Sequence, residues 1–113
     1  MKKVSDYVSN EPAFPYAEQV KVDELVGEVL TFMGYASRTG ETGEFYVLLV
    51  KHKDKELSFS NGGVVVMKVM KEIGEKQGVK ENEDKVVLFN EGVKGKLTQK
   101  KSKDGRLYYN IED

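Results

Sequence analysis

Cysteine is absent from this 113-residue sequence, which also lacks tryptophan and has a single histidine, His52. Without cysteine the chain can form no disulfide and no thiolate metal site, and it has no thiol nucleophile. One histidine cannot build a histidine-rich metal centre. We therefore expect no metal and no other cofactor, and a cytoplasmic setting, which a cysteine-free chain suits.

Long apolar stretches are missing as well. No run approaches the roughly 20 apolar residues of a membrane span, and residues 1–12 lack the apolar core of a secretory signal. We therefore expect no membrane partner. The sequence also has no recognisable nucleophile–base motif and no pair of acids in an evident pocket context, so we expect no enzymatic activity.

The charge that is present is unevenly distributed. The formal net charge is −1, yet residues 93–106 carry six basic side chains and one acidic one. A nearly neutral chain argues against affinity for nucleic acid over its whole surface. A local basic segment beside two tyrosines, Tyr108 and Tyr109, is what contact with a polyanion would require.

The basic segment belongs to an expected β-hairpin over residues 97–111, LTQKKSKDGRLYYNI. Two β-prone runs flank Asp104-Gly105, a dipeptide that favours a two-residue type I′ turn because both central positions need a positive φ. Leu107, Tyr109 and Ile111 share one parity and should face the core. Tyr108 should then face the other way.

Residues 1–19 are expected to form a flexible N-terminal arm ahead of a domain at residues 20–113. The arm holds both prolines, Pro12 and Pro15, and shows no sustained hydrophobic period. An arm that docks on its own or a neighbouring domain is the alternative. A homo-oligomer formed through this aromatic arm is an expected partner state.

The remaining pattern predicts five strands and one helix. Glycines inside the first strand, Gly27 and Gly34, should mark bends. Apolar side chains with helical spacing predict one amphipathic helix of about three turns. The expected strands are residues 21–38, 45–51, 56–60 and 86–89 and the final hairpin, and the expected helix is residues 64–77.

A helix between the third and fourth of five strands is the element order of the OB-fold, a mainly β Greek-key barrel. In that fold the helix, apolar on one face, would close one end of the barrel. A plain antiparallel sheet with one packed helix is the rival architecture. Glycine bends favour closure into a barrel because its corners need them.

Three segments carry a resemblance: LVGEVLTFMGYASRTGETGEFYVLLV, LSFSNGGVVVMKVMKEIG and KKSKDGRLYYNIE. Together they resemble small OB-fold single-stranded-DNA-binding proteins of bacteriophages and mobile elements. The resemblance implies sequence-tolerant binding of single strands on one face of the barrel, in DNA replication or repair.

Basic side chains are the expected phosphate contacts, because lysine and arginine supply most sequence-independent affinity for nucleic acid. Arg38 should clamp the strand from the opposite loop, and Lys51 and Lys53 should extend the track. A solubilising hairpin tip is the alternative. The hairpin residues expected to hold phosphates are Lys100, Lys101, Lys103 and Arg106.

Exposed rings are the second expected component, because bases stack on them. Tyr108 is the first candidate and Tyr35 the next, with Tyr46 as a third. The expected partner is single-stranded DNA or RNA. The rival function is an OB-fold protein-interaction or scaffold module that binds no nucleic acid, which the near-neutral net charge favours.

Overall fold

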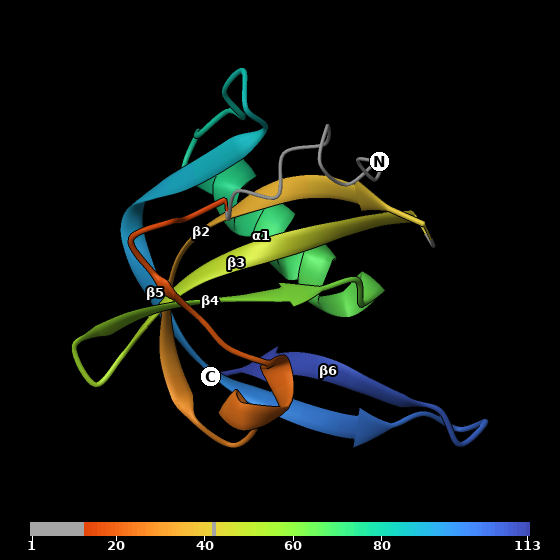
Figure 1. The fold of residues 1–113 in the computed structure, drawn as a ribbon. Helices are drawn as coiled ribbons and strands as arrows, with labels where there is room; N and C mark the ends of the chain where they lie inside the picture. The colour runs from red at the N-terminus through yellow and green to blue at the C-terminus, as the bar shows by residue number, and fades with distance from the viewer. Residues whose placement is uncertain (1–12, 42) are drawn as a thin grey trace, which may run out of the picture.

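The described part of the chain is mainly β, with six strands in a single sheet and one α-helix (Figure 1). The computed structural model describes residues 13–41 and 43–113. No helix within these residues has the length and apolar composition needed to cross a membrane. The elements are β1 (Glu18–Gln19), the 3-10 helix η2 (Val22–Leu25), β2 (Val29–Gly40), β3 (Gly43–His52), β4 (Lys55–Asn61), α1 (Val64–Lys76), β5 (Val86–Lys101) and β6 (Leu107–Glu112).

The strands follow the order β1-β4-β3-β2-β5-β6 across the sheet. All neighbours are antiparallel except β1 and β4, which pair in parallel through two residues. Within the described residues no ladder joins the outer strands, so the sheet is open. This corrects the expected five-stranded closed barrel, and α1 lies between the fourth and fifth of six strands.

A large bulge bends the sheet where β2 meets β5. Residues 29–32 of β2 pair with 93–96, and residues 34–36 pair with 86–88. Met33 alone therefore stands opposite four residues of β5, and such an excess bends and twists a strand. Gly34 is required here because a Cβ atom would lie 2.4 Å from the carbonyl oxygen of Val87. The expected bend at Gly34 is confirmed.

The expected first strand begins later than the sequence predicted. Residues 22–25 form η2, and a hydrogen bond of 3.1 Å from the Lys21 amide to the Glu24 carboxylate caps its N-terminus. Gly27 then adopts φ +88°, a conformation that glycine adopts without strain. Its amide donates to the Leu97 carbonyl over 2.7 Å, which brings the chain back to β5 before β2 starts.

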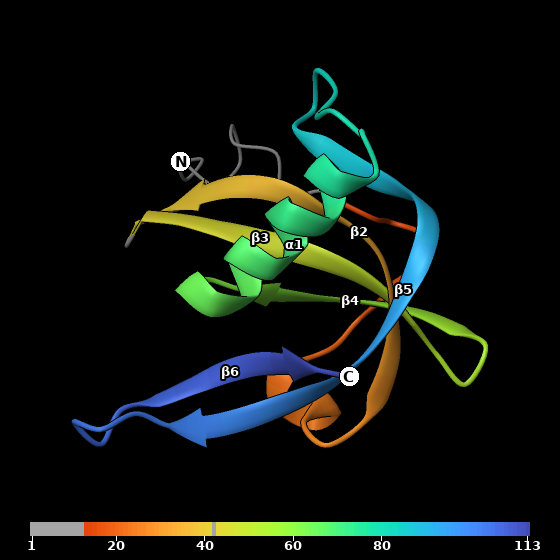
Figure 2. The ribbon, with the colours of Figure 1, turned by 180° about the vertical axis from the view of Figure 1, so that it is seen from behind.

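The amphipathic helix is confirmed by α1. Val66 and Met70 are fully buried, and Val69 and Ile73 pack against the same core. The helix lies on the inner face of the bent sheet and contacts β2, β5 and β6 (Figure 2). Aliphatic and aromatic side chains from β2 to β6 and Leu25 of η2 complete this main core.

A second, smaller core lies on the outer face of the sheet. Phe14 and Ala17 are buried there against Ala36 and Leu49. Residues 13–17, named the N-terminal strap here, cross the near side of the sheet in Figure 1, with α1 on the far side. Residues 1–12 of the expected arm lie outside the described residues. The packed domain therefore begins before residue 20.

Candidate nucleic-acid interface

The two strands of the C-terminal hairpin present different faces to the core and to solvent. Leu97 is fully buried opposite Ile111, and Tyr109 packs against the same core. The hydroxyl of Tyr109 also donates to the Asp23 carboxylate, which ties β6 to η2 and raises the pKa of the phenol. The expected alternation is confirmed here, although Leu107 at the start of β6 is 65% exposed and lies beyond the core.

The opposite face of the hairpin is open and basic. Lys100 pairs with Tyr108 across the ladder, and Lys96 pairs with Glu112. Cross-strand partners lie on the same side of a sheet, so these four side chains share the outer face. The ring of Tyr108 is half-buried beside Lys100.

The same face continues across the neighbouring strands. Thr31 of β2 pairs with Lys94 on one side and with Lys51 on the other. Alternate residues of a strand are about 6.8 Å apart and strands about 4.8 Å apart, so the ammonium groups form a spaced row. We name this surface the basic strip, and its members are Thr31, Lys51, Lys94, Lys96, Thr98, Lys100 and Tyr108.

Few acids oppose the lysines of the strip. Glu112 contacts the Lys100 ammonium, and this contact raises the pKa of Lys100. Glu56 lies opposite Lys51 in the β3–β4 ladder. Among the described residues, no acid lies within ion-pair distance of Lys51, Lys94 or Lys96. Three of the four ammonium groups are therefore free to meet an anion.

The tip of the hairpin lies apart from the strip. Lys101 alternates with Lys100 and pairs with Leu107, so it faces the other side of the hairpin. Lys103 lies in the turn, and the Arg106 guanidinium is 3.6 Å from the Asp104 carboxylate. These three basic side chains are exposed, but of the expected hairpin set only Lys100 belongs to the strip.

The turn itself differs from the expected type I′. Asp104 does not have a positive φ, whereas Gly105 has φ +87°. The Gly105 amide donates to the Ser102 carbonyl over 3.0 Å, the geometry of a type I turn followed by a left-handed glycine. Two consecutive positive φ angles occur instead at Lys53 and Asp54, in the β3–β4 hairpin. Lys53 is exposed at that tip, off the strip.

Tyr35 and Tyr46 are buried and face the core, which corrects their expected exposure. Their rings stack on each other with centroids 4.4 Å apart, and each is under 10% exposed. Burial raises the pKa of both phenols, that of Tyr35 to about 12. The register shift between Phe32 and Gly34 reverses the alternation of β2, so Tyr35 turns inward. A base cannot reach either ring without unpacking the core.

Arg38 is used within the fold. Its guanidinium donates to the Ser37 carbonyl over 2.8 Å and to the Asp84 carbonyl over 3.0 Å. These bonds hold β2 to the loop that precedes β5. The contacts found for the Arg38 guanidinium are therefore with backbone carbonyls of the fold itself.

Lys94 and Lys96 are the lysines of the strip that sequence reasoning did not single out. A signal was present, because lysine recurs at positions 94, 96 and 100 with the period of two that places side chains on one face of a strand. No cluster of metal-ligating side chains occurs among the described residues. His52 pairs with Glu28, 3.5 Å away.

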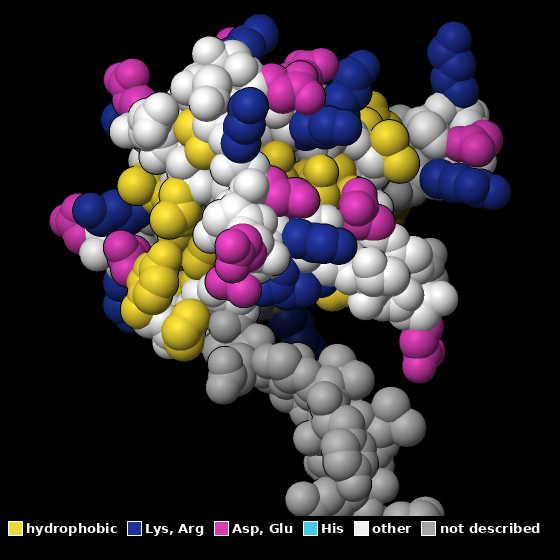
Figure 3. All heavy atoms as spheres, turned by 90° about the horizontal axis from the view of Figure 1, so that it is seen from above, with side chains coloured by type: hydrophobic (Ala, Val, Ile, Leu, Met, Phe, Trp, Pro, Cys, Tyr) yellow, Lys and Arg dark blue, Asp and Glu magenta, His cyan; other side chains and the backbone are white. Residues whose placement is uncertain are grey.

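The face seen from above carries both charges interspersed, with hydrophobic side chains between them (Figure 3). This face shows no continuous row of basic side chains. It differs in this from the outer face of β5, where the register places such a row. Comparison with protein-family models, with curated proteins and with solved structures finds no significant match for this chain. The case for a function therefore depends on the geometry of the strip.

Proposed function

We propose that this protein binds single-stranded nucleic acid with little sequence preference across the basic strip. The observation that carries the proposal is the ladder register, which sets four lysines and the Tyr108 ring on one open face. Lysines that neutralise phosphates release counterions and provide affinity without base readout. Stacking on Tyr108 would add roughly 1–3 kcal/mol per base. The binding involves no chemical step.

We also propose that the fold is a partly open barrel of the OB type, whose strand face binds oligonucleotides. The five long strands support this, since the bent β2 pairs with both β3 and β5, and α1 separates β4 from β5 in the chain. By the sequence resemblance, the ligand is DNA during cytoplasmic replication or repair. A homo-oligomer formed through the arm at residues 1–19 stays a prediction, and residues 1–12 of that arm lie outside the described residues.

The experiment compares two triple variants with the same change in charge. One replaces Lys94, Lys96 and Lys100 by alanine, and the control replaces three exposed lysines of α1: Lys68, Lys71 and Lys76. Affinity for labelled oligo-dT is measured by fluorescence anisotropy at several salt concentrations. The wild-type affinity should fall steeply as salt rises.

We expect the strip variant to bind roughly tenfold or more weakly at low salt, with a salt slope smaller by about two. The α1 variant should stay within about twofold of the wild type, because its lysines lie on the other side of the molecule. An equal loss of oligo-dT affinity in both variants would mean that the affinity depends only on the net charge of the protein. In that case the strip would not be the site.

A protein-interaction module is the second candidate, and exposed hydrophobic side chains favour it. Val29 is 59% exposed beside Lys96, and Leu107 is 65% exposed at the hairpin. Isolated exposed hydrophobics are common, so they carry less weight than the lysine row. If the wild type fails to bind oligo-dT even at low salt, this candidate replaces the first.

A further inference from the structure

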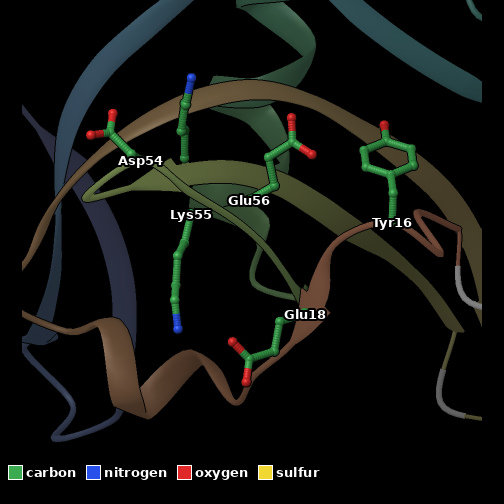
Figure 4. A pocket seen from close by; sticks show the side chains of 6 residues that line it. Tyr16, Glu18, Asp54, Lys55 and Glu56 are labelled. Carbon is green, nitrogen blue, oxygen red and sulfur yellow. The ribbon is translucent and has the colours of Figure 1, made fainter.

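A hollow of about 410 Å³ lies between the N-terminal strap and the β3–β4 hairpin (Figure 4). Tyr16 of the strap forms one side, and charged side chains from β1, β3, β4 and the hairpin turn form the rest. Its volume falls within the range of ligand sites, about 300–1,000 Å³. The lining residues are Tyr16, Glu18, Lys51, Asp54, Lys55 and Glu56.

Tyr16 is an exposed ring held in place by a buried one. Its side chain is 60% exposed, while Phe14, two residues earlier, is 2% exposed in the outer core. The two rings meet edge to face with centroids 6.2 Å apart. A ring positioned in this way can accept a stacked base with little loss of side-chain freedom.

The hollow is continuous with the basic strip through Lys51. This lysine lines the hollow, and by register it lies between Glu56 of β4 and Thr31 of β2. Lys94 of β5 lies on the other side of Thr31. In Figure 4 the side chains of Tyr16, Asp54 and Glu56 point to the same side of the ribbon. A strand that follows the lysines of β5 would therefore reach the hollow after crossing β2 and β3.

The charges of the hollow suit a base better than a phosphate. Figure 4 shows Glu18 and Lys55 on the opposite side of the ribbon, and the register puts Lys51 on the side of Glu56. Beside Tyr16 the two carboxylates of Asp54 and Glu56 therefore outnumber the single ammonium group, so a phosphate would meet net repulsion. A base is uncharged, its face can stack on a ring, and its edge carries N–H donors and oxygen or nitrogen acceptors for carboxylates and ammonium groups. From these contacts we infer that the hollow is a subsite for one nucleobase of the bound strand, stacked on Tyr16. The inference rests on the proposed single-strand binding.

The first test compares Tyr16→Ala with Tyr16→Phe, which keeps the ring. Oligo-dT binding to the full chain is measured by fluorescence anisotropy at two salt concentrations. We expect about tenfold weaker binding for Tyr16→Ala, an unchanged salt slope, and nearly normal binding for Tyr16→Phe. Val64→Ala, which removes an 80% exposed side chain on α1, is the control and should bind normally.

The second test needs no variant. An oligonucleotide carrying 5-bromouracil is crosslinked to the wild type by light, and the modified peptides are identified by mass spectrometry. A crosslink within the segment that carries Tyr16 is the expected result.

The possible failures are distinguishable. If the wild type binds but Tyr16→Ala binds equally well and no crosslink falls on the strap, the subsite is wrong and the basic strip stands. If the wild type does not bind oligo-dT at all, both the proposed function and the subsite are overturned.

Discussion

The outer face of the sheet has two halves, and they differ in what covers them. In one half Met33, Ala36, Val47 and Leu49 are apolar, and the strap covers them through Phe14 and Ala17. The other half carries the basic strip, and Lys51, Lys94 and Lys96 are exposed there. The same two strands, β2 and β3, run through both halves.

The difference shows that one strand can present a covered apolar surface and then an open charged one. In β3 the outward positions change from Val47 and Leu49 to Lys51 where the cover of the strap ends. Burial of the apolar half provides stability because it removes hydrocarbon surface from water. The lysine half provides no comparable burial, and under the proposed function its residues bind the ligand.

The largest expected effect is a loss of stability when a buried side chain is removed from the covered half. Phe14→Ala should lower the free energy of unfolding by about 3 kcal/mol, because it empties a fully packed site. Val29→Ala in the open half should change it by less than about 0.5 kcal/mol, since that side chain is 59% exposed. Urea unfolding of both variants measures the contrast. Similar losses would show that the two halves do not differ in their contribution to stability.

A smaller effect is expected at the boundary between the halves. Gly34→Ala should destabilise the fold by about 2 kcal/mol, because the new methyl group would press on the Val87 carbonyl of β5. Gly62→Ala is the control, since its Cβ would meet nothing closer than 3.6 Å. Amide exchange should speed up at residues 86–88 and stay slow at residues 93–96. Uniform loss of protection would contradict a local boundary.

The smallest expected effect is on oligonucleotide binding by the open half. Tyr108→Ala should weaken oligo-dT binding about tenfold and leave the salt slope unchanged, because stacking involves no counterion release. Leu88→Ala, which removes a half-exposed side chain from β5 beside Gly34, is the control. Tyr108 would have no stacking role if the two variants bound alike in an anisotropy titration.

The sequence predicted helices and strands well where the hydrophobic residues followed a single helical or strand period. The spacing of Val66, Val69, Met70 and Ile73 placed α1, and the alternation after Leu107 placed Tyr109 and Ile111 on the core side. The mainly β class followed from the remaining runs. These features depend on neighbours along the chain, which a sequence displays directly.

Features that depend on distant contacts were not predictable in the same way. The bulge at Met33 turns Tyr35 inward, and its size is set by the four facing residues of β5. β3 is apolar on both parities, so the side of Tyr46 could not be assigned until α1 and the strap were placed. The lysine row of β5 is joined to Lys51 only because β2 pairs with both β5 and β3.

The most direct test of the central claim is an amide chemical-shift titration of the wild type with unlabelled oligo-dT. Our account predicts the largest shifts at Thr31, Lys94, Lys96 and Tyr108, with little change at Ala36 and Val47 beneath the strap. Shifts concentrated on α1 or on the covered half, with the strip unchanged, would contradict it.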